Sequence, residues 1–146
     1  MPHLNGLELQ TQLAAHGALL PIIFLTGVGD IPMTVRAMKA GATGFFTKPF
    51  EPAELLDAVG GALAQSREAH TRLGELRELQ RRYATLTARE RAVMDEVIVG
   101  KLNKQIAHDF GTKETTVKEQ RAKMMEKMQV SSVAELVQVA VRLRAL

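Results

Sequence analysis

The segment Leu86–Met128 constrains the fold more than any other part of this chain. Thr87 stands three residues before Glu90, and at this spacing a hydroxyl and a carboxylate can each bond a free backbone N–H at a helix start. Apolar residues follow at helical intervals as far as Gly100, and glycine readily takes the left-handed conformation that ends many helices. A first helix is therefore predicted between Thr87 and Gly100. Its inner face is expected to hold Val93, Met94, Val97 and Ile98.

A second and a third helix are predicted after Gly100. The second begins near Asn103 and ends at Gly111, which allows a sharp turn. Its buried residues should be Ile106, Ala107 and Phe110. The third runs from about Lys113 to Met128, and its core face is expected to hold Val117, Met124 and Met128. Its opposite, exposed face should hold Lys118, Glu119, Ala122 and Lys123.

Two short helices, a tight turn and a longer helix form the layout of a helix-turn-helix, which places one helix in a DNA groove. Charge alone is a weak argument, because the five basic and three acidic side chains between Lys113 and Lys127 would also suit a solvated surface. The ordered combination of cap, glycine stop, short helix, glycine turn and long helix is more specific. DNA binding is therefore the leading functional prediction.

Several spaced motifs of this segment belong together. They are LTARERAVM, Gly100, NKQIAHDF, Thr116 with Val117, and Lys127 with Met128. In this order they resemble the LuxR-type helix-turn-helix that ends response regulators of the FixJ and NarL group. The chain departs from the usual pattern at Thr112 and Lys113, where the helix cap is expected to shift to Thr112, and at Gln120, where the family often has histidine.

The resemblance implies a division of DNA contacts. Three residues of the third helix should contact base edges: Lys118, Glu119 and Ala122. Five residues should lie nearer the phosphates: Lys104, Thr115, Arg121, Lys123 and Lys127. Cations neutralise phosphates with little regard for sequence, whereas groove-facing side chains discriminate between bases. Glu119 can accept a hydrogen bond from a cytosine amino group, or it can pair with Lys123 four residues on.

The resemblance also implies a fourth helix that packs beneath the motif and pairs two subunits. Ser132 to Arg144 fits such a helix, and the expected dimerisation residues are Val133, Leu136, Val137 and Ala140. The implied assembly is a homodimer on double-stranded promoter DNA.

The first sixty residues have a different pattern. An apolar run from Ile22 to Leu25, a helical stretch, a short strand at Phe45 and Phe46 and another helix suggest parallel strands with right-handed crossovers. The stretch TGVGDIPMTVRAMKAGATGFFTKPF resembles the end of a response-regulator receiver. In that resemblance Thr26 is the switch hydroxyl, Phe45 the switch aromatic and Lys48 the phosphate-binding lysine.

The beginning of the chain resembles the loop and helix that follow the phosphoacceptor in receivers. The acceptor would then lie upstream of Met1 and Pro2, so the chain is expected to hold a truncated receiver with no phosphoacceptor. None of Asp30, Asp57, Asp95 and Asp109 stands in an acceptor's place after a strand. If a complete receiver is encoded upstream of Met1, a sensor kinase becomes a partner. Without it, the strand Ile22 to Leu25 would keep one unpaired edge, which favours loose packing or association.

The expected fold class is α/β plus all-α. Residues 1–62 should form the C-terminal half of a doubly wound receiver domain, residues 63–84 a helical linker, and residues 85–146 a four-helix LuxR-type domain. From Leu55 to Tyr83, partly apolar residues recur every 3.5 positions. This stretch is either a weak coiled coil between two subunits or an exposed connecting helix.

Composition limits the remaining possibilities. The chain has no cysteine, and its four histidines are too far apart to suggest a metal site, so no cofactor is expected. Residues 85–146 carry eleven basic and eight acidic side chains, which places the basic excess where DNA should bind. With no membrane-length apolar run, a cytoplasmic, non-enzymatic regulator is expected. The alternative function is an interaction protein that dimerises with full-length regulators and titrates them without binding DNA.

Overall fold

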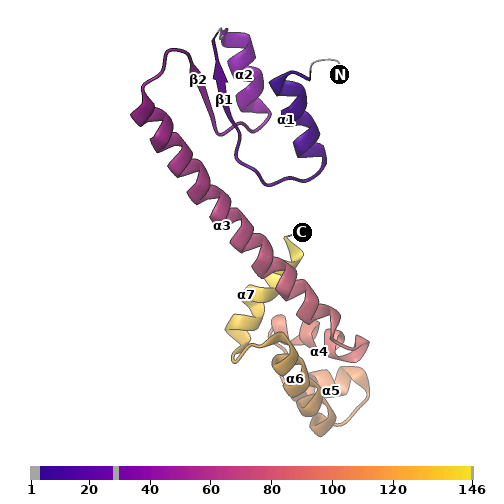
Figure 1. The fold of residues 1–146 in the computed structure, drawn as a ribbon. Coiled ribbons are helices and arrows are strands. Elements are labelled where there is room, and N and C mark those ends of the chain that lie inside the picture. The colour runs from indigo at the N-terminus through magenta and orange to yellow at the C-terminus, as the bar shows by residue number, and fades with distance from the viewer. Residues whose placement is uncertain (1–3, 28–29, 146) are drawn as a thin grey trace. The chain divides into compact units, whose positions relative to one another are not determined.

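The computed structural model describes residues 4–27 and 30–145, and these residues form two compact units. The first unit extends to Arg72 and the second begins at Leu73, so the boundary lies within one long helix, α3 (Pro52–Ala84) (Figure 1). The Met-Pro pair at positions 1 and 2, which carried part of the receiver resemblance, lies outside the described residues.

The first unit contains a parallel pair of strands and the helices around it. Its elements are α1 (Gly6–Ala15), β1 (Ile23–Thr26), α2 (Ile31–Lys39), β2 (Gly44–Thr47) and the first part of α3. Strands β1 and β2 pair in parallel, with Ile23 opposite Gly44 and Thr26 opposite Thr47. The predicted parallel pairing across a helical crossover is therefore confirmed.

Local signals explain where the helices of this unit begin. The Asn5 side chain accepts a hydrogen bond from the Glu8 backbone N–H at 2.9 Å, and the Glu8 carboxylate accepts one from the Asn5 N–H at 3.0 Å. This reciprocal capping box starts α1. Asp30 caps α2 by accepting a single hydrogen bond from the Met33 N–H at 2.6 Å. Neither cap depends on a distant part of the chain.

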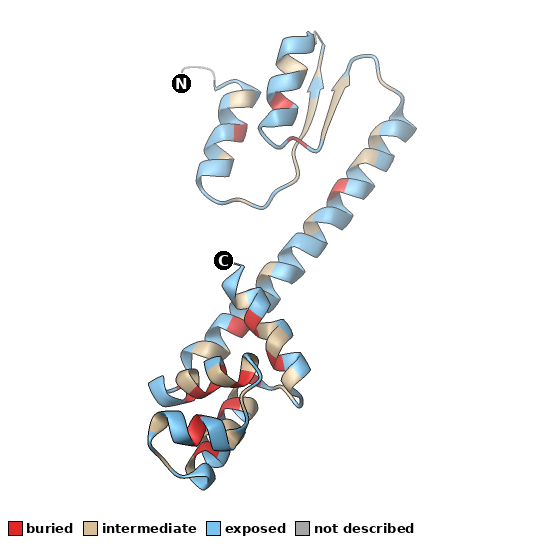
Figure 2. Cartoon of the chain, turned by 180° about the vertical axis from the view of Figure 1, so that it is seen from behind, coloured by how far each residue is buried: buried red, intermediate tan, exposed pale blue. Residues whose placement is uncertain are grey.

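Long-range packing in the first unit is sparse. Among its described residues, the buried apolar side chains are three alanines, Ala37, Ala42 and Ala62. Many large apolar side chains remain exposed, including Leu25 at 46%, Ile31 at 81% and Leu56 at 70%. Within the described residues β1 pairs with β2 alone, so its other edge carries no strand there. Figure 2 shows the few buried positions of this unit.

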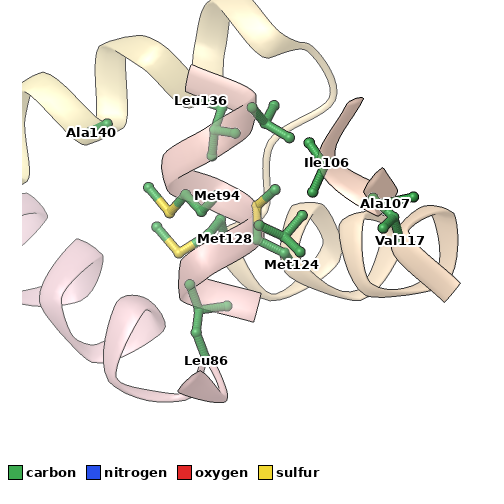
Figure 3. Close-up of a cluster of buried hydrophobic side chains, with 11 residues drawn as sticks. Leu86, Met94, Ile106, Ala107, Val117, Met124, Met128, Leu136 and Ala140 are labelled. Carbon is green, nitrogen blue, oxygen red and sulfur yellow. The ribbon is translucent and has the colours of Figure 1, made fainter. Parts of the chain in front are cut away.

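The second unit is a helical domain with a continuous core. Its helices after α3 are α4 (Ala88–Ile98), α5 (Asn103–Phe110), α6 (Glu114–Met128) and α7 (Val133–Arg144). Helix α6 packs against both α4 and α5, and α7 packs against α4. The side chains that gather between these helices come from all of them (Figure 3). The cluster consists of Leu86, Val93, Met94, Val97, Ile106, Ala107, Val117, Met124, Met128, Leu136 and Ala140.

The predicted helices of this unit agree with the structure, with two corrections. Thr87 and Glu90 form the expected capping box, and Gly111 adopts the left-handed conformation at φ 61° after α5. The N-cap of α6 is Lys113, however, so the predicted shift to Thr112 is wrong; Lys113 makes no side-chain cap bond. The segment 63–84 is also more than a linker. Its residue Leu79 is buried and Tyr83 packs on the core, so its second half belongs to the helical domain.

Candidate nucleic-acid interface

The turn between α5 and α6 determines which side of α6 is available to a ligand. Gly111 reverses the chain direction, and Val117, Met124 and Met128 then face the core with none of their surface exposed. Because the same helix face recurs every third or fourth residue, the opposite side of α6 must face solvent. Lys118, Glu119, Ala122 and Lys123 are all exposed, as predicted, and so is Thr115 in the first turn.

The charged residues on this exposed side of α6 are available for contacts. Glu119 and Lys123 form no ion pair in the described part of the chain, so the alternative in which they neutralise each other is absent from this conformation. Lys104, in the first turn of α5, is also exposed. Together these residues form an exposed surface with several cationic side chains and one acid, and such a surface suits a polyanion.

Arg121 differs from the exposed cations of α6. Its Nη1 donates a hydrogen bond to Oδ1 of Asn103 at 2.9 Å, and the residue is half-buried. Asn103 is the first residue of α5, so this bond joins the two helices of the turn motif across 18 positions of sequence. Part of the hydrogen-bonding capacity of Arg121 therefore serves the fold.

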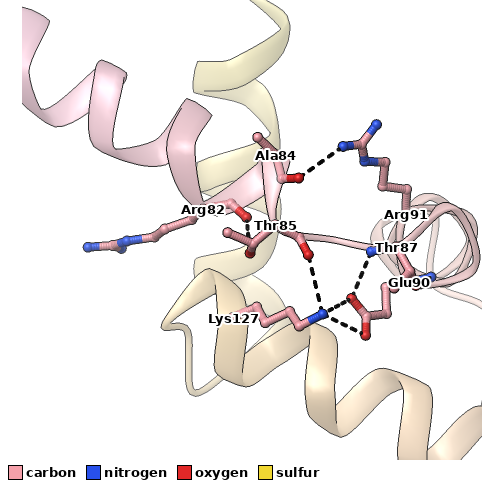
Figure 4. Close-up of polar contacts among 7 residues, drawn as sticks. All are labelled: Arg82, Ala84, Thr85, Thr87, Glu90, Arg91 and Lys127. Carbon is pink, nitrogen blue, oxygen red and sulfur yellow. Dashed lines mark hydrogen bonds and ion pairs between the residues drawn. The ribbon is translucent and has the colours of Figure 1, made fainter.

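Lys127 is held by a buried carboxylate (Figure 4). Its Nζ lies 2.8 Å and 3.0 Å from the two carboxylate oxygens of Glu90, and it donates to the Thr85 carbonyl oxygen at 3.3 Å. Glu90 is only 4% exposed and also accepts the Thr87 N–H at 3.0 Å. The hydrogen bond from Lys127 is the main reason that the pKa of Glu90 lies below its ordinary value. The structure thus places Lys127 in an internal ion pair, whereas the sequence predicted a phosphate contact.

A second basic residue, Lys101, is also engaged within the domain. It pairs with Asp109 at 2.8 Å and with Glu96, and these hydrogen bonds, first that of Asp109, raise the pKa of Lys101 to about 12. Arg89 stacks over the Phe110 ring, with 4.8 Å between the guanidinium carbon and the ring centroid. The sequence did not predict these contacts. Lys101 lies in the loop before α5 and Asp109 lies near the end of that helix, so the pair lacks the i, i+3 or i, i+4 spacing of helical ion pairs.

Helix α7, which the sequence predicted as the fourth helix of the domain, packs beneath the motif as expected. Its predicted dimerisation residues need correction. Leu136 is fully buried and Ala140 is 5% exposed, because both pack into the core of their own chain. Val133 and Val137 are half-buried. The exposed apolar side chains near α7 are instead Val99, which is 69% exposed, and Val141, which is 63% exposed. Both line a shallow pocket of about 140 Å³ with Val137.

In the first unit, the predicted switch residues lie at one end of the strand pair. Thr26 ends β1, and its carbonyl oxygen accepts a hydrogen bond from the Lys48 N–H at 2.7 Å. Lys48 is exposed one residue after β2, and Phe45 is half-buried with its ring stacked 6.0 Å from that of Phe24. Thr26 and Lys48 are therefore neighbours at the carboxyl ends of two parallel strands, where ligands bind in such sheets.

Neither a metal-binding cluster nor a membrane-spanning helix is found in the described residues. Residues 4–27 and 30–145 contain no group of three or more metal-binding side chains. No helix in the same ranges has both the length and the apolar character needed to cross a membrane.

Family models match both parts of the chain. Residues 1–60 match the response regulator receiver domain, and residues 84–140 match the LuxR family of bacterial regulatory proteins. These matches define the class: a two-part regulator with receiver sequence followed by a LuxR-type helix-turn-helix.

Curated relatives agree with this class. The chain is 46% identical over 99% of its length to the response regulator protein TodT of Pseudomonas putida, and spans 63% of that protein. It is 39% identical over 97% of its length to the transcriptional regulatory protein FixJ of Bradyrhizobium diazoefficiens, and spans 69% of that protein. Of the solved structures, the response regulator StyR is 45% identical with a TM-score of 0.88, covering 97% of this chain and 72% of StyR. The chain belongs to the FixJ-like response regulators with a LuxR-type domain.

Proposed function

We propose that this chain regulates transcription by sequence-specific binding of α6 in the major groove of promoter DNA. The observation that carries the proposal is the contrast between the two faces of α6. One face is fully buried at Val117, Met124 and Met128, while the other exposes Lys118, Glu119 and Lys123. A rigidly anchored helix with free charged side chains suits direct contact with base edges.

The exposed residues divide by position along the motif. Lys118, Glu119 and Ala122 lie on the exposed side of α6 and are assigned to base edges. Lys104, Thr115 and Lys123 are assigned to phosphates. Arg121 is assigned a shared role, since one of its nitrogens already donates to Asn103 while a guanidinium has five donors in all.

The proposed assembly on DNA is a homodimer on two half-sites. The support for it is the exposed apolar surface around Val99 and Val141, which a second copy could cover, and the similarity to regulators such as TodT and FixJ. Because the chain spans only part of the length of those relatives, their activities are only proposed for this chain. A sensor kinase is proposed as a partner only for a chain with a complete receiver.

We infer that the phosphoacceptor is absent from this sequence, so residues 1–62 supply the part of the receiver that follows it. The four aspartates support this. Asp30 caps α2, Asp57 lies within α3, Asp95 pairs with Arg144 and Asp109 pairs with Lys101. Incubation with acetyl phosphate should therefore leave the mass of the chain unchanged. A phosphoryl adduct on any of these residues would contradict the inference.

The function is tested by selecting DNA sites from a random library with the full chain, then measuring affinity across a salt series. We expect enrichment of a paired motif and an affinity that falls steeply with salt. Lys118→Ala should relax selectivity at one base position, at a cost of about 1–3 kcal/mol for the preferred sequence. The matched control, Lys123→Ala, should weaken all sequences alike.

A second candidate function rests on the edge of β1 that carries no strand among the described residues. An exposed strand edge with apolar neighbours such as Leu25 can pair with another chain, so the protein could titrate full-length regulators. In that case the chain would bind a full-length regulator with no affinity for DNA of any sequence. Finding site-selective DNA binding by the chain alone would favour the first function.

A further inference from the structure

The ammonium group of Lys127 makes its hydrogen bonds inside the domain. A lysine ammonium has three N–H donors and no acceptor. Three acceptors surround Nζ in the structure: both carboxylate oxygens of Glu90, at 2.8 Å and 3.0 Å, and the carbonyl oxygen of Thr85, at 3.3 Å. The donors that reach Glu90 and Thr85 are therefore directed into the domain, and the charge of Lys127 is paired there (Figure 4). The side chain is 35% exposed, so its contact with solvent is incomplete.

The carboxylate partner cannot easily release Lys127. Glu90 has a side chain that is only 6% exposed, and it sits in the first turn of α4, where it also closes the capping box with Thr87. A buried carboxylate that loses its cation is costly, since the charge is then neither solvated nor paired. Moving Lys127 toward a phosphate would leave Glu90 in that condition.

The contact joins three segments that are distant in sequence. Lys127 lies in the last turn of α6, Glu90 lies 37 residues earlier at the start of α4, and Thr85 lies in the connection that follows α3. One ammonium group thus fixes the C-terminal end of α6 relative to the beginning of the domain. Since α6 carries the exposed residues proposed to contact DNA, the position of those residues depends on this attachment.

We propose that Lys127 is a positioning residue, which orients the recognition helix through Glu90 and Thr85 and does not contact phosphate. The expected effect of Lys127 on DNA binding rests on the proposed function, whereas its hydrogen bonds to Glu90 and Thr85 do not. The same surface offers a matched control in Lys123, one helical turn earlier. Lys123 is exposed and forms no ion pair in the described part of the chain, although its charge does act on Glu90 through space.

The experiment compares Lys127→Met with Lys123→Met in the full chain, bound to the site selected from the library. Each variant loses one positive charge from the same helix. We expect Lys123→Met to reduce the slope of log affinity against log salt by about 0.9 for each phosphate contact removed. Lys127→Met should lower the affinity at every salt concentration and leave the slope unchanged. Lys127→Arg, which keeps the charge and several donors, should restore part of the affinity.

A double-mutant cycle keeps the proposal testable if Lys127→Met is too unstable to bind. Thermal unfolding is measured for Lys127→Met, Glu90→Gln and the double variant. Two residues that act through each other should show shifts in Tm that are strongly non-additive, with the double variant little worse than either single one.

The possible results separate the two proposals. If the wild-type chain shows no salt-dependent DNA binding but the cycle is non-additive, the proposed function fails and the positioning contact stands. If Lys127→Met reduces the salt slope as much as Lys123→Met, or if the Tm shifts simply add, Lys127 is not a positioning residue.

Discussion

The two units of the chain differ in where their large apolar side chains lie. In the helical unit, Ile106, Met124 and Leu136 are fully buried in one continuous cluster. In the first unit, the buried apolar side chains among the described residues are alanines, and larger ones, such as Ile31 and Leu56, remain exposed. Each unit contains a helix that begins with a capping box, α1 in the first and α4 in the second. The units differ, therefore, in long-range packing and not in local structure.

The difference shows what local signals can and cannot do. The Asn5 and Glu8 capping box in the first unit has hydrogen bonds of 3.0 and 2.9 Å, and the Thr87 and Glu90 box in the second has hydrogen bonds of 3.0 and 3.1 Å. Capping contributes about 1 kcal/mol to a helix, whereas fully burying one large apolar side chain contributes about 1.5–3 kcal/mol. Only the second unit combines both contributions, so we expect most of the stability of the described chain to reside there.

The largest expected effect is a difference in hydrogen exchange between the units. Backbone amides of α4 and α6 should exchange at least roughly a thousandfold more slowly than those of β1, because core helices open only with the whole domain. Exchange followed by mass spectrometry on the full chain, at a concentration where it is monomeric, measures this. Equal protection of Ile23–Thr26 in a demonstrated monomer would mean that the first unit has stabilising contacts beyond those described.

A substitution in each unit sharpens the comparison. Ile106→Ala removes a fully buried side chain and should destabilise the helical unit by about 2–5 kcal/mol. Ile31→Ala, the same chemical change at a residue that is 81% exposed, should cost less than about 0.5 kcal/mol. Denaturant unfolding followed by circular dichroism compares the two. A larger loss from Ile31→Ala would show that α2 is covered by a partner in solution.

Much of the helical unit could be predicted from its sequence, because its signals are local and periodic. The capping box at Thr87, the glycine turn at Gly111 and the buried face of α6 each depend on residues within one or two helical turns. The parallel pairing of β1 and β2 could also be predicted, since strand, helix and strand follow one another directly.

The role of Lys127 could not be predicted in this manner. Its partner Glu90 lies 37 residues away, and no periodicity links the two positions. The sequence also assigned Leu136 and Ala140 to a dimer surface, because a helical stripe does not reveal whether it faces its own core or a second subunit. The roles of such residues can be assigned only from the three-dimensional structure, even when the fold is recognised from the sequence.

Acid should weaken the helical unit through Glu90. The pKa of this carboxyl is lowered, first by the hydrogen bond from Lys127, so its stabilising contribution is complete above its ordinary value of 4.5. This contribution decreases as the pH falls below 4.5, and it is lost once the pH has passed below the lowered pKa of Glu90 in the folded state. We expect the Tm of the second unit to fall across this range, and Glu90→Gln to reduce the fall. Identical profiles of Tm against pH for the wild type and Glu90→Gln would mean that other acids, such as Asp109, cause the fall in Tm.

The smallest gain in stability is expected at a glycine of α3, the helix that extends into both units. Gly74 lies in the part of α3 that belongs to the helical unit, and a Cβ added there meets nothing within 4 Å. Gly74→Ala should stabilise that unit by about 0.5–1 kcal/mol, since glycine loses more conformational freedom in a helix than alanine.

Two further glycines complete this test. Gly61→Ala lies in the first unit with equally open surroundings, so it should leave the unfolding transition of the second unit unchanged. Gly100→Ala is the opposite control, because φ is +91° there and alanine would be strained, which lowers the Tm. Differential scanning calorimetry resolves shifts of this size. If Gly61→Ala stabilised the second unit as much as Gly74→Ala, the long helix would unfold as one element, and the boundary at Leu73 would not divide the chain energetically.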